Sequence, residues 1–280
     1  PVVLVNARLS RRSEARYQKL RWIAAPIFNQ ISTLCLQEPS DKERWISLGV
    51  EPSKLQVTGS IKFDDAAAAP RPERDFWPVL ETLGVTRGSP TIVAGSTFEG
   101  EELLVSEVYQ NLRKAHPNLF LIIVPRHQER SNDVAAQLQQ RGLKVARRTD
   151  SSPDEKPDLL LVDTTGELAN WYRCASVVFI GKSLLAEGGQ NPAEAVAAGV
   201  PVVFGPNMQN FASLVSSFLK AKGAMEVRDA ESLESALDQL LRSPELRQSM
   251  VQSAASCLEI HRSATHRTVQ IIQGFLQATP

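Results

Sequence analysis

Short apolar runs rich in β-branched residues alternate with segments of helical periodicity along the whole chain. In the first part, the apolar runs cover residues 2–5, 32–36 and 55–58, and the helical patterns cover 13–29 and 41–48. Strands that alternate with helices in this way are typical of βα units, whose strands form a parallel sheet. Residues 1–63 are therefore predicted to form a small α/β domain.

A second and longer series of the same kind follows. Its predicted strands are residues 91–94, 119–124, 144–147, 159–162, 177–180, 202–204 and 224–227. Its predicted helices are residues 100–114, 132–141, 165–172, 192–198, 211–219, 233–241 and 244–277. This series predicts a complete parallel sheet with helices on its faces.

The two series are separated by residues 64–78, which contain three prolines and four consecutive alanines and favour a linker. The predicted fold is therefore α/β with two Rossmann-like domains: a partial N-terminal domain over 1–63, the linker, and a second domain over 79–280 that includes the closing C-terminal helices. Pro1 is followed at once by the first apolar run, so we expect a further segment of the first domain to precede the sequence.

Composition and charge argue against several classes of protein and kinds of site. Lys+Arg and Asp+Glu both number 31, and this zero net charge argues against a nucleic-acid-binding protein. The three cysteines are scattered without CxxC spacing, and no apolar run reaches the length of a membrane span. No cluster has metal-ligand spacing, and the pair Asp64-Asp65 falls in the predicted linker. We therefore expect neither a metal nor another cofactor.

Ligands of open parallel sheets bind at the carboxyl ends of the strands, so the residues that follow each predicted strand are the candidates. Ser96 and Thr97 could hold an anion or could cap the next helix, whose dipole Glu99 to Glu102 would complement. Arg126 could bind a phosphate or form a surface ion pair, and His127 could be an acid, a base or structural. Thr165 and Gly166 could present backbone N–H groups, or Asp163 could simply cap a helix.

The segment 179–204 gives the strongest signal, with a strand, a glycine-rich loop, a helix and a second strand. Asn191 is a candidate N-cap, Pro192 suits the first helical position, and Glu194 falls where a capping box places its acid. Such a helix start suits a phosphate, and Glu194 could instead bind the hydroxyls of a ribose. Residues 205–211 could contact a sugar or could only form a turn.

An ordered set of motifs resembles one family, the 3-deoxy-D-manno-octulosonic acid (Kdo) transferases of lipopolysaccharide biosynthesis. The motifs are NARLSRRS (6–13), VTGSIKFD (57–64), GSTFEGEE (95–102), VPRHQER (124–130), DTTGEL (163–168), GKSL (181–184), GGQNPAEA (188–195) and GPNMQNF (205–211). The resemblance implies a GT-B glycosyltransferase that is inverting and metal-independent. It implies transfer of Kdo from CMP-Kdo to a lipid A precursor (lipid IVA) at the cytoplasmic face of the inner membrane, with peripheral membrane contact.

The resemblance also implies site residues. The implied CMP ligands are Pro125, Arg126, Thr165, Gly166, Glu167, Asn191, Pro192, Ala193 and Glu194. Further candidates for sugar or phosphate contacts are Ser96, Thr97, Lys182, Ser183, Gly189 and Gln190. The family usually has glycine at the position of Lys182 and histidine at that of Gln190. Its catalytic base is a glutamate that would lie upstream of residue 1, so this chain alone is expected to be inactive.

Two other functions are compatible with the same residues. One is a different GT-B enzyme, such as a UDP-sugar transferase or an epimerase, and the other is a nucleotide-binding module without catalysis. Arg8, Arg11 and Arg12 could meet acceptor phosphates or anionic headgroups, or could form a solvated helix face.

Overall fold

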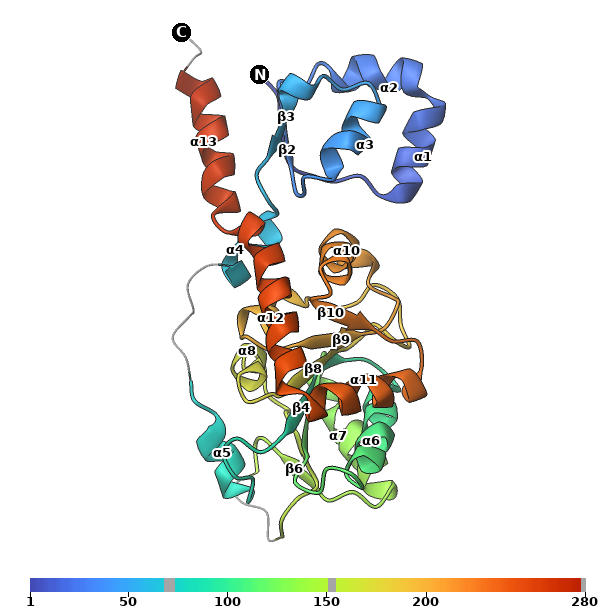
Figure 1. Cartoon of the computed structure of the whole chain (residues 1–280), viewed down its shortest axis with the longest axis vertical. Helices are drawn as coiled ribbons and strands as arrows, with labels where there is room; N and C mark the ends of the chain where they lie inside the picture. The colour runs from blue at the N-terminus through green and yellow to red at the C-terminus, as the bar shows by residue number, and fades with distance from the viewer. Residues whose placement is uncertain (68–73, 151–154, 278–280) are drawn as a thin grey trace. The chain divides into compact units, whose positions relative to one another are not determined.

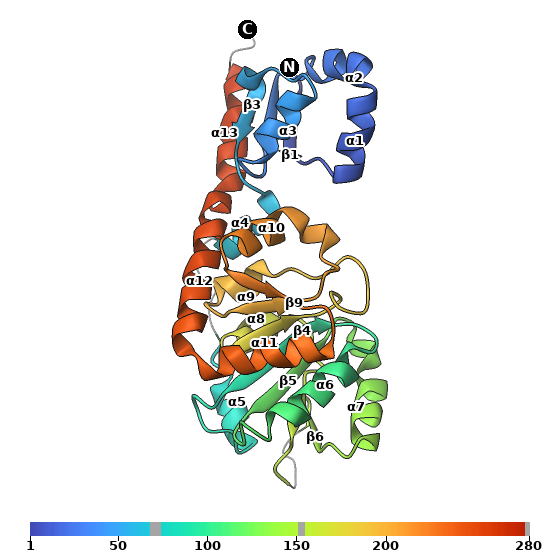
Figure 2. The ribbon, with the colours of Figure 1, turned by 45° about the vertical axis from the view of Figure 1, so that its right-hand side comes forward.

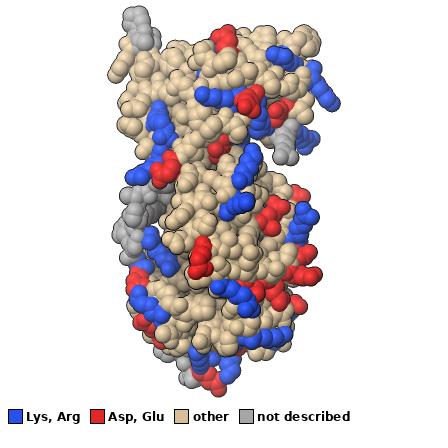
Figure 3. All heavy atoms as spheres, viewed as in Figure 1, with Lys and Arg blue, Asp and Glu red and all other residues tan. Residues whose placement is uncertain are grey.

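The computed structural model describes residues 1–67, 74–150 and 155–277, and it divides the chain into two compact units. One unit comprises Pro1–Pro70 together with Leu258–Pro280, and the other comprises Arg71–Cys257 (Figure 1). Positive and negative side chains are interspersed over the face shown in Figure 3, in line with the zero net charge. Both units are α/β with parallel strands, so the predicted fold class of two Rossmann-like domains is confirmed.

The first unit contains a parallel sheet with the strand order β1-β2-β3. Its elements are β1 (Val3–Ala7), α1 (Arg11–Lys19), α2 (Arg21–Phe28), β2 (Thr33–Leu36), α3 (Asp41–Ser47), η1 (Pro52–Lys54), β3 (Leu55–Val57), α4 (Ile61–Ala67), η4 (Glu259–His261) and α13 (Ala264–Gln277). The inward side chains of β2, such as Leu34 and Leu36, form the core with the buried Trp45 of α3. The sheet is thus covered by its own helices as the apolar pattern requires.

The predicted helix over residues 13–29 is broken at Leu20, whose backbone leaves the helical region (φ −113°, ψ 27°). The break brings two aromatic rings together. Tyr17 and Phe28 stack edge to face at 5.2 Å, and Phe28 meets Trp45 in the same way at 5.2 Å. In one continuous helix Tyr17 and Phe28 would be separated by about 16 Å along the axis, so the aromatic cluster requires two helices.

The second unit contains a parallel sheet with the strand order β10-β9-β8-β4-β5-β7-β6. Its strands are β4 (Thr91–Thr97), β5 (Phe120–Pro125), β6 (Val145–Arg147), β7 (Leu159–Leu161), β8 (Val177–Ile180), β9 (Val202–Phe204) and β10 (Ala224–Glu226). Its helices are α5 (Trp77–Thr82), α6 (Glu101–Leu112), η2 (Gln128–Arg130), α7 (Ser131–Gln140), α8 (Leu168–Tyr172), α9 (Ala193–Ala197), η3 (Gln209–Phe211), α10 (Ala212–Lys220), α11 (Ala230–Arg242) and α12 (Pro244–Leu258).

Helices cover both faces of this sheet. On one face, α6, α7 and α11 lie side by side (Figure 2), and Ile92 and Ala94 of β4 share a core cluster with side chains of α6 and α11. On the other face, a Cβ added to Gly95 would lie 2.3 Å from the hydroxyl of Tyr172 in α8. Because successive residues of a strand point to opposite faces, Ala94 and Gly95 identify the two helical layers.

The C-terminal residues correct the predicted domain boundary, which placed all of 79–280 in the second domain. The predicted helix over 244–277 is interrupted after Leu258, and residues 258–280 belong to the first unit. His261 is buried there, and its Nδ1 accepts a hydrogen bond from the backbone N–H of Ser60 at 3.0 Å. The Arg267 guanidinium donates to the carbonyl of Thr58 at 2.7 Å, so side chains rather than helical periodicity decide where this segment folds.

The predicted linker over 64–78 is shorter than expected. Residues 64–67 belong to α4, and residues 77 and 78 begin α5. Asp64 accepts a hydrogen bond from the backbone N–H of Thr265 at 2.9 Å, which ties α4 to the start of α13. Residues 68–73 lie outside the described part of the chain.

Candidate functional site

The candidate site lies at the carboxyl edge of the seven-stranded sheet. β4 is paired with β5 on one side and with β8 on the other, and the chain order reverses at this point. In open parallel sheets such a reversal leaves a crevice between neighbouring loops, where ligands bind. Because all strands are parallel, the segments predicted after β4, β5, β7, β8 and β9 all lie along this edge.

The end of β4 and the loop after β8 are in direct contact. Ser96 and Thr97 belong to β4 and are buried, with Ser96 in the left-handed region (φ 53°). A Cβ added to Gly181 would lie 2.4 Å from the carbonyl oxygen of Ser96. The predicted alternative that Ser96 or Thr97 caps α6 is wrong, because the N-cap is Gly100. The Thr97 hydroxyl instead donates to Glu102 Oε1 at 3.0 Å, within the protein.

The Glu101 side chain accepts hydrogen bonds from the backbone of the glycine-rich loop. Its carboxylate is fully buried and accepts the backbone N–H of Lys182 at 2.6 Å and of Phe98 at 2.9 Å on Oε2. On Oε1 it accepts the backbone N–H groups of Ser183 and Leu184, each at 3.0 Å. Successive backbone N–H groups in such a turn form an anion-binding nest. The nest at 182–184 is therefore filled by an internal carboxylate, and the sequence, which indicated only a helix-dipole role for Glu101, missed this.

Two predicted contact residues, Ser183 and Gly189, form hydrogen bonds within or next to the glycine-rich loop. The Ser183 side chain is fully buried, and its hydroxyl donates to the carbonyl of Ile180 and accepts the backbone N–H of Gly205 at 2.8 Å. The backbone N–H of Gly189 donates to the carbonyl of Lys182 at 2.9 Å. The Ser183 hydroxyl is therefore bonded within the protein and is not exposed for a sugar contact in this structure. Gln190 is half-buried between Gly189 and the start of α9.

The segment 205–211 supports the glycine-rich loop. Gln209 Oε1 accepts the backbone N–H of Gly188 at 2.8 Å, and the side-chain amide of Asn207 donates to the carbonyl of Leu184 at 3.3 Å. A Cβ added to Gly189 would lie 2.4 Å from the sulfur of Met208, so the two loops pack closely. The sequence allows two roles for this segment, a sugar contact and a turn, and these bonds show that it forms a turn that supports the neighbouring loop.

Two arginines that follow β5 differ in their partners. Arg130 pairs with the buried Glu102, at 3.0 Å between Nη1 and Oε1. Arg126 is exposed at the strand end, where its backbone N–H donates to the carbonyl of Thr97 at 2.9 Å. Its guanidinium makes no ion pair or hydrogen bond with any described residue. The alternative of a surface ion pair for Arg126 is therefore not observed among the described residues, and the Arg130 pair is with a buried acid. Pro125, before Arg126, is buried.

His127 and the 163–167 turn complete this side of the edge. His127 is exposed and lies 3.3 Å from Glu129. Thr165 and Gly166 are exposed before α8, with Gly166 in the left-handed region (φ 78°), whereas the Glu167 carboxylate is bound by Arg148 at 3.1 Å. The predicted N-cap role of Asp163 is wrong. Asp163 instead accepts the backbone N–H of Thr149 at 3.1 Å, and Glu167 is the N-cap.

The predicted helix start after β8 is present one residue later than expected. Pro192 is the N-cap of α9, and Asn191 Oδ1 accepts the backbone N–H of Ala193 at 3.1 Å. Ala193 is fully buried, whereas Glu194 is exposed and its carboxylate makes no hydrogen bond with a described residue. The capping box is therefore not formed, and its glutamate faces solvent. Burial raises the pKa of Tyr172, and the negative charge of Glu194 raises it further.

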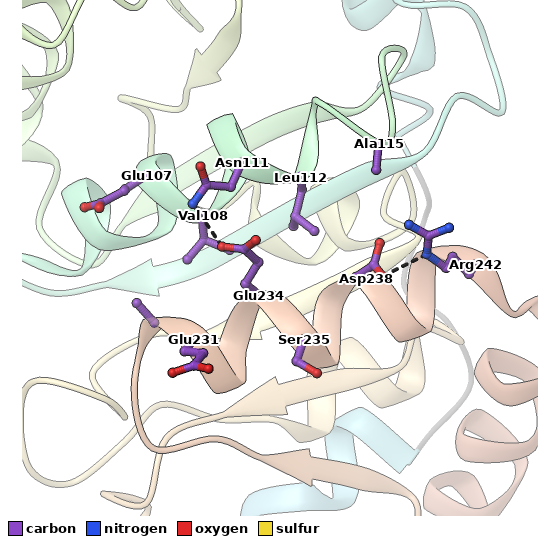
Figure 4. A pocket seen from close by; sticks show the side chains of 11 residues that line it. Glu107, Val108, Asn111, Leu112, Ala115, Glu231, Glu234, Ser235, Asp238 and Arg242 are labelled. Atoms are coloured by element: carbon purple, nitrogen blue, oxygen red, sulfur yellow. Dashed lines mark hydrogen bonds and ion pairs between the residues drawn. The ribbon is translucent and has the colours of Figure 1, made fainter.

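Other features of the second unit do not form a competing site. A groove between α6 and α11 is lined by acidic side chains, three of which have partners (Figure 4). Asn111 donates to Glu234 at 3.0 Å, Arg242 pairs with Asp238 at 2.8 Å, and Arg141 pairs with Glu107 at 3.6 Å. Within residues 1–67, 74–150 and 155–277, no group of three or more His, Cys, Asp or Glu side chains could hold a metal ion. None of the described helices is both long and apolar enough to span a bilayer.

Comparison with known proteins gives relatives over nearly the whole chain. The 3-deoxy-D-manno-octulosonic acid transferase of Haemophilus influenzae is 32% identical over 281 residues, covering 99% of this chain and 65% of the relative. The enzyme of that name from Bordetella pertussis is 35% identical over 284 residues, covering 99% of this chain and 64% of the relative. The chain thus spans slightly less than two thirds of the length of these proteins.

A solved structure and two family models agree with this comparison. The C-terminal CMP-Kdo binding domain of WaaA from Acinetobacter baumannii is 26% identical with a TM-score of 0.61, covering 71% of this chain and 99% of that domain. The model of the 3-deoxy-D-manno-octulosonic-acid transferases (kdotransferases) matches residues 1–65. The model of the glycosyl transferases group 1 matches residues 102–256. This second match covers more than half of the chain, and the chain therefore belongs to the glycosyl transferases group 1 family.

Proposed function

We propose that the second unit binds CMP-Kdo at the carboxyl edge of its sheet, and that the whole protein transfers Kdo from this donor to a lipid A precursor (lipid IVA). The proposal is supported by the Kdo transferases that are 32% and 35% identical and by the likeness to a CMP-Kdo binding domain. The observation that carries it is the Arg126 guanidinium at the end of β5, which has no partner among the described residues and follows the strand paired with β4, where the chain order reverses.

Each ligand group has a candidate partner at this edge. Arg126 would bind the phosphate through its charge, and the positive end of α9 would add to the attraction although the Ala193 N–H is already bonded to Asn191. The exposed Glu194 carboxylate would accept hydrogen bonds from the ribose hydroxyls. Thr165 and Gly166 are exposed and would present backbone groups to the cytidine, whereas Glu167 would contribute through its backbone because Arg148 holds its carboxylate.

The proposed reaction is an inverting transfer without a metal. A base outside this chain would deprotonate the acceptor hydroxyl, which would attack the anomeric carbon as CMP leaves. Arg126 and the α9 start would stabilise the negative charge that develops on the leaving phosphate, the role that a cation has in other transferases. On this proposal, the chain alone binds the donor but does not turn it over.

We further propose that the first unit makes peripheral contact with an anionic membrane, the cytoplasmic face of the inner membrane. Trp22, Ile23 and Ile27 of α2 expose 77%, 42% and 56% of their surface. The neighbouring helix α1 exposes Arg16 and Lys19. Apolar side chains beside basic ones suit the interface of an anionic bilayer.

The donor site is tested by calorimetry of CMP binding to the chain. We expect Arg126→Ala to weaken CMP roughly tenfold or more, because it removes a charged hydrogen-bond donor to phosphate. Arg141→Ala is the matched control, since Arg141 is an exposed arginine at the opposite edge of the same sheet. Equal CMP affinity of Arg126→Ala and wild type would exclude this site, and preferential binding of UDP would favour a UDP-sugar enzyme.

A further inference from the structure

Lys182 is held in a backbone conformation that an L-residue rarely adopts. Its φ is 53°, in the left-handed region, which is unfavourable for a residue with a Cβ. The conformation is imposed by Glu101, whose buried carboxylate accepts the backbone N–H groups of Lys182, Ser183 and Leu184. A residue kept under strain by its surroundings at a candidate site is a reason to ask what its side chain does.

The Lys182 ammonium lies over the ring of Phe98, with Nζ 5.2 Å from the ring centroid. This is a cation–π contact, which fixes the position of the charge without neutralising it. Within the described part of the chain, no carboxylate pairs with Nζ. A half-buried lysine that stacks on a ring without an acidic partner retains a positive charge that a ligand can use.

Lys182 and Arg126 approach the end of β4 from opposite sides. Arg126 follows β5 and is bonded through its backbone to Thr97, the residue before Phe98. Lys182 follows β8, the other neighbour of β4, and stacks on Phe98. On the β5 side, His127 faces the same ring at 6.1 Å between centroids. Two cations without a partner among the described residues thus follow the two strands that flank β4, at the point of the sheet edge where ligands of open parallel sheets bind.

We propose that Lys182 is a second anion-binding residue of the donor site, which contacts an oxyanion of the sugar nucleotide, and that Glu101 is the residue that positions it. The inference rests on the proposed function, because CMP-Kdo carries two kinds of oxyanion, the phosphate of CMP and the carboxylate of the sugar acid. Lys182 donates hydrogen bonds from its ammonium to one of them, and Arg126 binds the phosphate from the β5 side.

The test compares binding of CMP and of CMP-Kdo by calorimetry to the wild-type chain, Lys182→Met and Lys182→Arg. Lys182→Met removes the charge and keeps the length of the side chain. Lys222→Met is the matched control, because Lys222 is an exposed lysine that is also left-handed (φ 57°) and lies before β10, at the opposite edge. Both methionine variants therefore change the net charge and the strain alike.

We expect Lys182→Met to weaken CMP-Kdo roughly tenfold, as for loss of one charged hydrogen bond, and Lys182→Arg to restore most of the affinity. Lys222→Met should stay within twofold of wild type. An equal loss for CMP identifies the phosphate as the partner, and a loss for CMP-Kdo alone identifies the carboxylate; both support the proposal.

Two outcomes overturn the inference and are distinguishable. If wild type binds CMP-Kdo and Lys182→Met binds it within twofold, or if Lys222→Met loses as much, Lys182 is not a ligand while the proposed function stands. If wild type binds neither CMP nor CMP-Kdo, the proposed function fails and the inference fails with it.

Discussion

Replacing Glu101 by glutamine tests how strongly the loop after β8 depends on one buried carboxylate. The Glu101 side chain is fully buried and accepts four backbone N–H groups, two on each oxygen. Glutamine keeps one acceptor oxygen and turns an NH2 group toward the other two donors. The retained oxygen is best placed at Ser183 and Leu184, whose bonds are fully buried, so Phe98 and Lys182 lose their acceptor.

The magnitude follows from these lost bonds. A buried N–H group without an acceptor costs about 1–3 kcal/mol, and the lower half of this range applies here because the bonds of Phe98 and Lys182 are only partly buried. We therefore expect Glu101→Gln, which leaves two such groups, to lower the free energy of unfolding by about 2–4 kcal/mol. This is a large share of the 5–15 kcal/mol that is typical of a domain.

Urea unfolding followed by circular dichroism and tryptophan fluorescence measures this loss as a shift of the midpoint at constant slope. Glu99→Gln is the matched control, because Glu99 is exposed in the same turn and loses the same charge without a buried bond. If the midpoint for Glu101→Gln equals that of Glu99→Gln, the four backbone bonds to Glu101 do not stabilise the loop after β8, and the positioning role of Glu101 toward Lys182 is refuted.

Two further expectations concern thiols and membranes. Burial raises the pKa of Cys174 to about 11 and also raises the pKa of Cys35. Because the thiolate is the reactive form, iodoacetamide at pH 8 should label only the half-buried Cys257 in the folded chain. In urea it should label all three cysteines. Labelling of Cys174 in the folded chain as fast as Cys257, seen by peptide mass spectrometry, would contradict its burial. Replacing Trp22 and Ile27 together by serine should reduce co-sedimentation with anionic vesicles roughly tenfold, because two apolar side chains no longer enter the interface. Leu276→Ser, at another exposed apolar residue, is the control, and unchanged sedimentation of the double variant would refute the α2 contact.

The sequence predicts the sheet of the second unit well because each strand is marked locally. The strand 177–180 is a continuous apolar run between polar or glycine residues, and it is observed with these bounds; so is 202–204. Both are buried on both faces, which is the environment that such runs indicate. The continuous periodicity of residues 13–29 and of residues 244–277 predicts one unbroken helix in each segment. Their breaks depend on tertiary contacts, the Tyr17–Phe28 stacking in one and the burial of His261 in the other.

The difference between local sequence signals and tertiary contacts also applies within the candidate site. The residues that we propose to face a ligand, such as Arg126 and Glu194, follow strands or begin helices, and their positions in the sequence are sufficient to nominate them. Residues that shape the site act over long sequence separations, as Glu101 does on Lys182 across 81 positions. An acid that starts a helix has the same local pattern whether it complements a dipole or fills a nest of N–H groups. Only the fold distinguishes the two roles. It also shows why the glycine-rich loop can hold Lys182 in a left-handed conformation, because the buried Glu101 carboxylate supplies the hydrogen bonds that offset the strain.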